Sequence, residues 1–332
     1  MAKVSSLRHV DVAVPEFEEA VEFYGGIWGL TRVDGEKDVA FFAAEGSPEQ
    51  FIYRIRKAPE KRLDLVAFGA DSPADVDELA AGLASAGTRF VSEPGDLQTP
   101  GGGYGFRFFD PDGRVVEISA GVEQRTPREV ELREGIPVAL NHVVLNSPNR
   151  KEVEAFYAEN LGFKLSDWIP FMGFYRCNIN HHSLAIADGE VATLNHVAFE
   201  VRSIDDMMRG SGRVLKDGRA QVMMGPGRHS AGDNTFYYFF DPHGNVSEYT
   251  AEVEQIVDED KWTPREHPMA DMWGTARMPG PPPGAQGAPS GRMSGPPPGA
   301  RGAPSGRPPQ AGDLPPTRMR QQDPGLWVAP PV

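Results

Sequence analysis

The chain contains two copies of one long segment, and this duplication constrains its fold more than any other feature. Residues 108–117, FFDPDGRVVE, return as residues 239–248, FFDPHGNVSE. Further matches at nearly the same distance along the chain pair His9 with His142, Phe23 with Phe156 and Leu65 with His196. The offset is 131 to 133 residues in every case. Such a constant spacing indicates a tandem repeat of domain size, so we expect two related domains.

Each half is predicted to contain two smaller modules. In the second half, residues 140–145 and 194–199 are short apolar runs rich in β-branched residues, and a helix-like stretch follows each of them. The first of these helices is expected to begin near Ser147 and to end at Gly162. Short strands broken by Gly, Asn and Asp complete each module. We therefore predict an α+β fold of four βαβββ modules, near residues 5–58, 59–121, 138–188 and 190–253.

The C-terminal part of the chain differs from the rest in composition. Residues 280–292, GPPPGAQGAPSGR, are repeated with one change as residues 295–307. Sequences so rich in Pro and Gly have little to bury and favour extended, solvated conformers. We expect an N-terminal domain at 1–125, a C-terminal domain at 126–274 and a disordered tail at 275–332.

The net charge and the cysteine content limit which binding partners and which cellular compartment are expected. The net charge is −14, and the tail carries six Arg against two Asp, so the two domains together carry about −14 − 4 = −18. This acidity argues against nucleic acid as a partner. No apolar run approaches the roughly 18 residues of a membrane helix, and the N-terminal residues lack a signal-peptide core. Cys177 has no second cysteine to pair with, so a cytoplasmic location is expected.

Three residues in the second half form a candidate metal site. His142 and His196 occupy the same position in two copies of one module, and Glu248 ends a strand at the point where a module would close against them. Two imidazoles and one carboxylate are the set that holds Fe(II) on one face and leaves the other face open. His243, in a turn, and His267, beside a proline, are interpreted as exposed.

The hairpin before Glu248 places a phenol beside this site. If Phe240 pairs with Val246, Tyr238 lies directly across from Glu248, and the two side chains share one face of the sheet. A tyrosine in that position is a plausible hydrogen-bonding group for a bound substrate.

These residues resemble a known family over roughly residues 5–255, the type I extradiol ring-cleavage dioxygenases of the vicinal oxygen chelate superfamily. The members it resembles include catechol 2,3-dioxygenases and 2,3-dihydroxybiphenyl 1,2-dioxygenases. The family's C-terminal signature matches here as Gly227-Arg228-His229, Tyr238, Asp241-Pro242-His243-Gly244 and Glu248. The sequence departs from the signature only at Tyr237, where an aliphatic residue or Phe is usual.

The resemblance implies a role for each residue. The metal ligands would be His142, His196 and Glu248. His181 lies fifteen residues before His196, the spacing of the family's acid–base histidine, so it is preferred to His182, which is interpreted as a loop histidine. His229 and Tyr238 match residues that contact the substrate and the oxygen-derived intermediate. The first domain would be a scaffold, because Leu65 stands where the second domain has His196, so that His9 and Glu117 lack a third ligand.

The function implied by the resemblance is cleavage of the aromatic ring of a catechol by O2 at Fe(II), in the degradation of aromatic compounds. Mn(II) also accepts two nitrogens and a carboxylate, so the metal is left open between the two. The chelating residues do not select among monocyclic, biaryl, fused-ring and heteroaromatic diols. A homo-oligomer is also left open.

Two other functions remain as alternatives. One is an oxygen-independent, glyoxalase-like lyase or isomerase of the same superfamily, which would have no reason to keep His181, His229 and Tyr238 together. The other is a non-catalytic protein that binds a small molecule in the same concave sheet. Such binding proteins typically lack the metal triad, so the triad argues against this second alternative.

Overall fold

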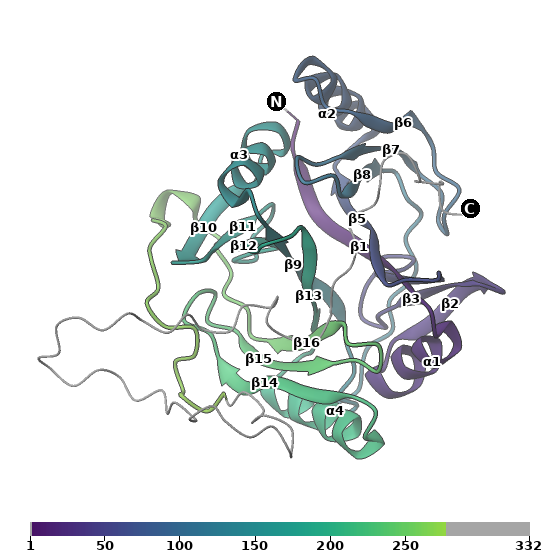
Figure 1. The fold of residues 1–332 in the computed structure, drawn as a ribbon, viewed down its shortest axis with the longest axis vertical. Helices are drawn as coiled ribbons and strands as arrows, with labels where there is room; N and C mark the ends of the chain where they lie inside the picture. The colour runs from purple at the N-terminus through teal and green to yellow at the C-terminus, as the bar shows by residue number, and fades with distance from the viewer. Residues whose placement is uncertain (1, 277–332) are drawn as a thin grey trace, which may run out of the picture.

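The computed structural model describes residues 2–276, which form two eight-stranded sheets (Figure 1). The strand order is β2-β3-β4-β1-β5-β8-β7-β6 in the first sheet and β10-β11-β12-β9-β13-β16-β15-β14 in the second. The two orders are the same once the strands are numbered within each domain. The duplication in the sequence is therefore a duplication of structure.

Each sheet is built from two βαβββ modules, as predicted. The first contains β1 (Val4–Val14), α1 (Phe17–Glu22) with a one-turn extension η1 (Phe23–Trp28), β2 (Thr31–Glu36), β3 (Val39–Ala43) and β4 (Tyr53–Lys57). The second contains β5 (Arg62–Ala70), α2 (Pro73–Ser85), β6 (Phe90–Asp96), β7 (Tyr104–Phe109) and β8 (Val115–Ala120). In the centre of this sheet β1 pairs with β5 in antiparallel orientation, which joins the two modules.

The second domain repeats the plan. Its first module contains β9 (Ala139–Ser147), α3 (Arg150–Leu161), β10 (Lys164–Ile169), β11 (Met172–Arg176) and β12 (Leu184–Asp188). Its second module contains β13 (Thr193–Glu200), α4 (Ile204–Asp217), β14 (Gln221–Arg228), β15 (Thr235–Phe240) and β16 (Val246–Ala251), after which a short turn, η2 (Glu259–Lys261), follows. The predicted α+β fold is thus confirmed. The predicted tail lies almost wholly outside the described residues.

Local sequence explains where the helices begin and end. The Ser72 hydroxyl accepts a hydrogen bond from the Asp75 backbone N–H at 3.2 Å, and Pro73 occupies the first helical position of α2. Helix α3 begins at Arg150, one turn later than expected from Ser147, and ends before Gly162 as predicted. Gly162 has a φ of 77°, a left-handed conformation that glycine adopts without strain.

The domains pack through one shared core. The Trp28 ring stacks on Tyr249 of the other domain at 3.9 Å, and the Tyr249 hydroxyl donates to the Trp28 carbonyl at 2.6 Å. Two further contacts mirror each other: the Tyr24 hydroxyl donates to Asp241 at 2.9 Å, and the Tyr157 hydroxyl donates to Asp110 at 3.3 Å. Strand β1 also lies beside β9 (Figure 1). The domains therefore have a fixed mutual position.

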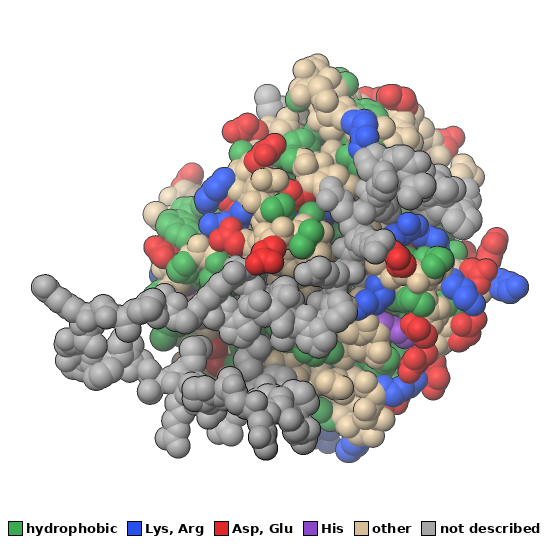
Figure 2. All heavy atoms as spheres, in the orientation of Figure 1, with side chains coloured by type: hydrophobic (Ala, Val, Ile, Leu, Met, Phe, Trp, Pro, Cys, Tyr) green, Lys and Arg blue, Asp and Glu red, His purple; other side chains and the backbone are tan. Residues whose placement is uncertain are grey.

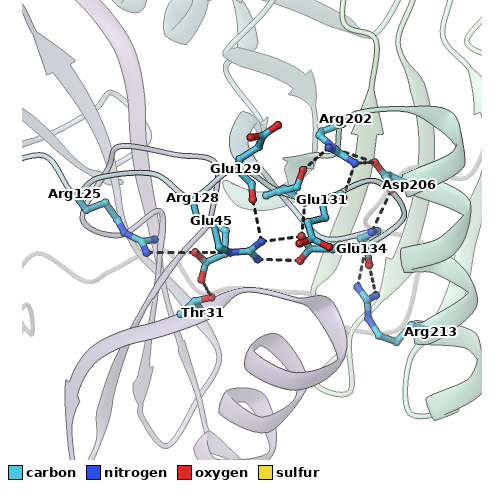
Figure 3. A network of polar contacts seen from close by, with 12 residues as sticks. Thr31, Glu45, Arg125, Arg128, Glu129, Glu131, Glu134, Arg202, Asp206 and Arg213 are labelled. Atoms are coloured by element: carbon cyan, nitrogen blue, oxygen red, sulfur yellow. Dashed lines mark hydrogen bonds and ion pairs between the residues drawn. The ribbon is translucent and has the colours of Figure 1, made fainter.

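A polar network holds the segment that connects the two domains (Figure 3). Arg128 of this connection pairs with Glu134 at 2.8 Å and with Glu45 of the first domain at 3.5 Å. Arg213 of α4 donates to the carbonyls of Glu134 and Gly135 at 3.2 and 2.7 Å. The connection is thus tied to both domains.

Surface charge and helix length relate to two partners that the sequence argues against, nucleic acid and membranes. On the face shown in Figure 2, acidic and basic side chains of the described residues are interspersed rather than gathered into one broad basic area. Among residues 2–276, no helix is both long and apolar enough to cross a membrane.

Candidate metal centre

Strand pairing brings His142, His196 and Glu248 together. Ala198 of β13 pairs with His142 of β9 on one side and with Glu248 of β16 on the other. His196 lies two residues before Ala198, and residues two apart in a strand share a face of the sheet. All three side chains are buried. The structure therefore places these three predicted residues in one cluster.

The distances within the cluster fit a bound divalent cation. Glu248 Oε2 lies 3.1 Å from His142 Nε2 and 3.2 Å from His196 Nε2, and the two Nε2 atoms are 3.4 Å apart. Among the described residues, neither carboxylate oxygen of Glu248 has a hydrogen-bond partner. A buried carboxylate without a partner is costly, and a metal ion held by all three donors would remove this cost. Two imidazoles and a carboxylate suit iron or manganese.

Two asparagines hold the candidate ligand histidines, and the sequence prediction did not include them. His142 Nδ1 lies 2.7 Å from Asn141 Oδ1, and His196 Nδ1 lies 2.7 Å from Asn195 Oδ1. Because Nδ1 of each ring contacts an asparagine, Nε2 of each ring faces Glu248. The repeated Asn-His dipeptide was the available signal, because it occurs at both ligand positions.

Burial and the neighbouring groups set the charges of the cluster. Burial alone would raise the pKa of Glu248, but His142 and His196 bring it below its usual range. Burial lowers the pKa of His196 despite the nearby carboxylate. An ionised carboxylate and a neutral imidazole are the forms that bind a metal.

Tyr238 and His229 lie beside the cluster. The predicted hairpin register is confirmed, because Phe240 pairs with Val246 and Tyr238 with Glu248. The Tyr238 hydroxyl lies 2.8 Å from His229 Nε2, and His229 Nδ1 lies 2.8 Å from the Ala270 carbonyl. A carbonyl only accepts, so Nδ1 carries the proton, and the Tyr238 hydroxyl donates to Nε2. Burial raises the pKa of Tyr238 and lowers that of His229, so the phenol keeps its proton and the imidazole stays neutral.

The two adjacent histidines, His181 and His182, are arranged one behind the other. The His182 ring packs against that of His142 in a tilted arrangement, with the ring centroids 4.2 Å apart, whereas His181 lies behind it, with the Nδ1 atoms of His181 and His182 3.0 Å apart. His182 lies in the loop between β11 and β12, as interpreted from the sequence, but it is only 2% exposed and contacts a candidate ligand. Burial lowers the pKa of His182 well below its usual value. His182 therefore lies beside the candidate cluster, and His181 lies next to His182.

A buried carboxylate, Asp167 of β10, supports His181. Asp167 Oδ2 lies 3.2 Å from His181 Nε2 and 2.7 Å from His267 Nε2, and Oδ1 accepts the Arg265 N–H at 2.9 Å. Burial would raise the pKa of Asp167, but its hydrogen bonds, first that from His181, lower it. The carboxylate is therefore ionised and accepts the Nε2 proton of His181.

Two histidines were expected to be exposed, and both predictions are wrong. His267 is buried because the segment after β16 returns along β10, where the His267 N–H donates to the Trp168 carbonyl at 2.8 Å. The His243 side chain is 2% exposed, since its turn faces the first domain and places Nδ1 3.5 Å from Glu16. Both burials depend on contacts between segments far apart in the sequence.

Comparison with known proteins gives the family. A model of the glyoxalase/bleomycin resistance protein/dioxygenase superfamily matches residues 6–118 and 139–249, and the chain belongs to this superfamily. Metapyrocatechase 2 from Cupriavidus necator is 27% identical, over 82% of this chain and 89% of that protein. A manganese-dependent 2,3-dihydroxybiphenyl 1,2-dioxygenase from Geobacillus genomosp. 3 is also 27% identical, over 85% of this chain and 97% of that protein.

A solved structure is also similar. The Mn(II)-bound glyoxalase from Novosphingobium aromaticivorans is 43% identical, with a TM-score of 0.81 over 85% of this chain and 96% of that chain. The match extends through both domains, so the duplicated architecture belongs to that protein as well.

Proposed function

We propose that this chain is a metal-dependent extradiol dioxygenase that cleaves the ring of a catechol with O2. The observation that carries the proposal is the buried Glu248 carboxylate, which faces His142 Nε2 and His196 Nε2 without a hydrogen-bond partner among the described residues. His229 and Tyr238 lie beside this carboxylate, and the resemblance assigns both of them to this chemistry. His182, which contacts His142, is the neighbour of His181, a third residue that the resemblance assigns. Two similar proteins are named as a metapyrocatechase and a 2,3-dihydroxybiphenyl dioxygenase, which supports the same reaction.

His142, His196 and Glu248 would hold the metal. We propose Fe(II), with Mn(II) as the alternative, because the donor set suits both and one similar dioxygenase is named as manganese-dependent. When bound, the metal supplies a centre where catechol and dioxygen meet, which overcomes the poor reactivity of triplet dioxygen with a singlet ring.

The proton of the catechol is proposed to go to the histidine pair. Ionised Asp167 accepts the Nε2 proton of His181, so Nδ1 of His181 is free to accept the Nδ1 proton of His182. This order leaves a lone pair on Nε2 of His182, in the ring that contacts His142. The sequence favoured His181 as the acid–base group, whereas this arrangement supports His182 as the base and His181 as the residue that orients it.

Tyr238 and His229 are proposed to bind the substrate oxygens. Their hydroxyl and imidazole form one hydrogen-bonded pair of 2.8 Å, and the Tyr238 ring lies 5.0 Å from that of His196. The phenol proton is directed to His229 Nε2 and the imidazole proton to the Ala270 carbonyl, so the free function of the pair is the Tyr238 oxygen, which can accept a hydrogen bond from a hydroxyl of the diol beside the candidate ligands.

An oxygen-independent, glyoxalase-like reaction is the second candidate. One observation favours it: the solved structure that is 43% identical is named as a glyoxalase. The same ligand set could stabilise an enediolate without O2. The buried proton-transfer residues around the centre favour the dioxygenase, because an oxygen-independent lyase has no evident use for His182, His229 and Tyr238 together.

Oxygen uptake tests the proposal. The protein is loaded anaerobically with Fe(II), or in parallel with Mn(II), and mixed with a panel of monocyclic, biaryl and fused-ring catechols. We expect O2 consumption with at least one catechol, together with a yellow ring-fission product, and neither signal from His142→Ala. Metal binding without O2 uptake, combined with anaerobic turnover of an α-hydroxy carbonyl compound, would replace the dioxygenase by the second candidate.

A further inference from the structure

The two asparagines that precede the ligand histidines occupy β-bulges. In the pairing of β9 with β13, Ala198 pairs with His142 and Phe199 with Leu140, so Asn141 is skipped. In the same way, Leu194 pairs with Leu145 and His196 with Val144, so Asn195 is skipped. Neighbouring residues of a regular strand point to opposite faces, but a bulge redirects the extra side chain. Each bulge therefore allows an asparagine to reach the ring of the histidine that follows it.

Each asparagine fixes which nitrogen of its histidine carries the proton. The amide oxygen lies 2.7 Å from Nδ1 in both pairs. An amide oxygen only accepts, so the proton is on Nδ1 and the lone pair is on Nε2, which faces Glu248. A metal ligand needs that lone pair, and the group bonded to the other ring nitrogen holds it in place.

A second partner sets the orientation of each amide. Asn141 Nδ2 donates to Glu200 Oε2 at 3.0 Å, and Asn195 Nδ2 donates to Asn146 Oδ1 at 2.8 Å. Turning either amide over would bring its NH₂ group toward the histidine and would break this bond. The orientation of both oxygens is therefore determined by groups that do not touch the metal cluster.

The partner of Asn195 is itself anchored on the first domain. Asn146 Nδ2 donates to Thr193 Oγ1 at 2.8 Å, which keeps its Oδ1 toward Asn195. The Asn146 carbonyl accepts a hydrogen bond from Arg114 of the first domain, and this buried guanidinium is held by Asp110 and Asp112 at 2.8 Å each. The corresponding residue of the second domain, Asn245, bonds to Asp241 within its own turn.

We propose that Asn141 and Asn195 are positioning residues for the metal ligands, and that the first domain supports one of them through Arg114 and Asn146. The proposal rests on the metal site described above. It gives the first domain a defined part in that site: Arg114 fixes the backbone from which Asn146 orients the Asn195 amide.

Metal affinity tests the proposal without requiring turnover. Mn(II) is titrated into the metal-free full chain, and the free ion is measured by electron paramagnetic resonance. We expect Asn141→Ala and Asn195→Ala each to weaken binding about 10- to 100-fold, the usual effect of removing such a partner. Asn146→Ala should cause a smaller loss, because the Asn195 oxygen remains. Asn160→Ala, in which the lost amide belongs to α3, is the matched control and should bind as the wild type does.

Asn195→Asp provides a test that does not depend on a cavity-forming variant. It keeps an oxygen that accepts from Nδ1, although it replaces the donor to Asn146 by a second oxygen and adds a negative charge. Its affinity should therefore stay closer to that of the wild type than the affinity of Asn195→Ala does. Equal affinities of folded Asn141→Ala, Asn195→Ala and Asn160→Ala would overturn the proposal, as would equal losses in the Asp and Ala variants of Asn195. Failure of the wild type itself to bind Mn(II) or Fe(II) would overturn the metal site, and this inference with it.

Discussion

Tyr238 lies across from Glu248 in the second domain, and in the first domain the same place in the register belongs to Arg107, across from Glu117. Arg107 Nε is 2.8 Å from Glu117 Oε2, so a fixed cation neutralises the first carboxylate. Leu65 takes the place of the second candidate ligand, His196. Equivalent positions of the two sheets therefore hold a buried carboxylate differently: a guanidinium of the chain neutralises Glu117, whereas Glu248 is proposed to bind a metal ion.

The two domains also differ in the aromatic ring that packs on His9 in the first domain and on His142 in the second. In the first domain Phe51 packs on His9 at 4.3 Å and 42°, and in the second His182 packs on His142 at 4.2 Å and 46°. The aromatic contact is present in both domains. The covering ring of the second domain, His182, has nitrogen atoms that can carry a proton, whereas Phe51 has none. Packing and proton transfer are thus separable at this position, and the first domain gives the substitution that separates them.

The largest effect is expected when a ligand is replaced by its counterpart from the first domain. His196→Leu removes one imidazole and leaves a side chain that the equivalent position already accommodates. We expect the variant to fold, to bind no metal and to have no activity, because two remaining donors do not make the three-ligand site. Metal content per chain, measured after loading with Fe(II) and removal of excess ion, checks this. His9→Leu is the control in the first domain and should keep the wild-type metal content; loss of metal there would show that the first domain also binds.

A smaller effect is expected from His182→Phe, which copies Phe51. The ring contact with His142 should persist, so metal affinity should stay near that of the wild type. The kcat for catechol cleavage should fall about 10²- to 10⁴-fold, the usual contribution of general acid–base catalysis. His181→Gln is the companion variant, and its kcat should fall less, because His182 would lose only its orienting partner. A larger loss in His181→Gln than in His182→Phe would return the acid–base role to His181.

Local sequence patterns were sufficient for the fold and for the clustering of the three candidate ligands. The modules, the end of α3 and the hairpin register depend on short-range signals, and the duplication doubled each of them. His142, His196 and Glu248 could be predicted because strand pairing at corresponding positions fixes their proximity.

The surroundings of the ligands could not be predicted in the same way. Asp167 meets His267 only because the segment after β16 folds back along β10, a contact between residues 100 positions apart. The bulges at Asn141 and Asn195 change which face the asparagines reach, and no residue pattern of a regular strand indicates this. Placing His182 in front of His181 likewise depends on the loop between β11 and β12, which has no periodicity to read.

The smallest effect concerns the pH dependence of stability, for which the two domains have opposite signs. Burial lowers the pKa of His9, but Asp11 and Glu117 outweigh it and raise the pKa above its usual value. His9 therefore stabilises the fold fully below about pH 6.5, and this contribution is lost as the pH rises through the raised pKa. His182 has a lowered pKa, so it is neutral in the folded state. As the pH falls below about 6.5 the unfolded chain takes up a proton at this residue, and the fold loses stability.

Neutral replacements should separate these two contributions. In metal-free protein unfolded by urea, His182→Phe should cost less stability at pH 5.5 than at pH 8.5. The difference should be at most about 1.4 kcal/mol, because pH 5.5 lies about one unit below the ordinary histidine pKa of about 6.5 in the unfolded chain, and one unit corresponds to that energy. His9→Phe should cost more at pH 5.5 than at pH 8.5, because it removes a proton-binding group paired with Asp11 at 2.7 Å. The difference in sign follows from the neighbours of each ring: carboxylates surround His9, whereas the nearest rings to His182 include His142 and His181. A pH dependence of the same sign in both variants would mean that the two sites do not differ in charge as the comparison requires.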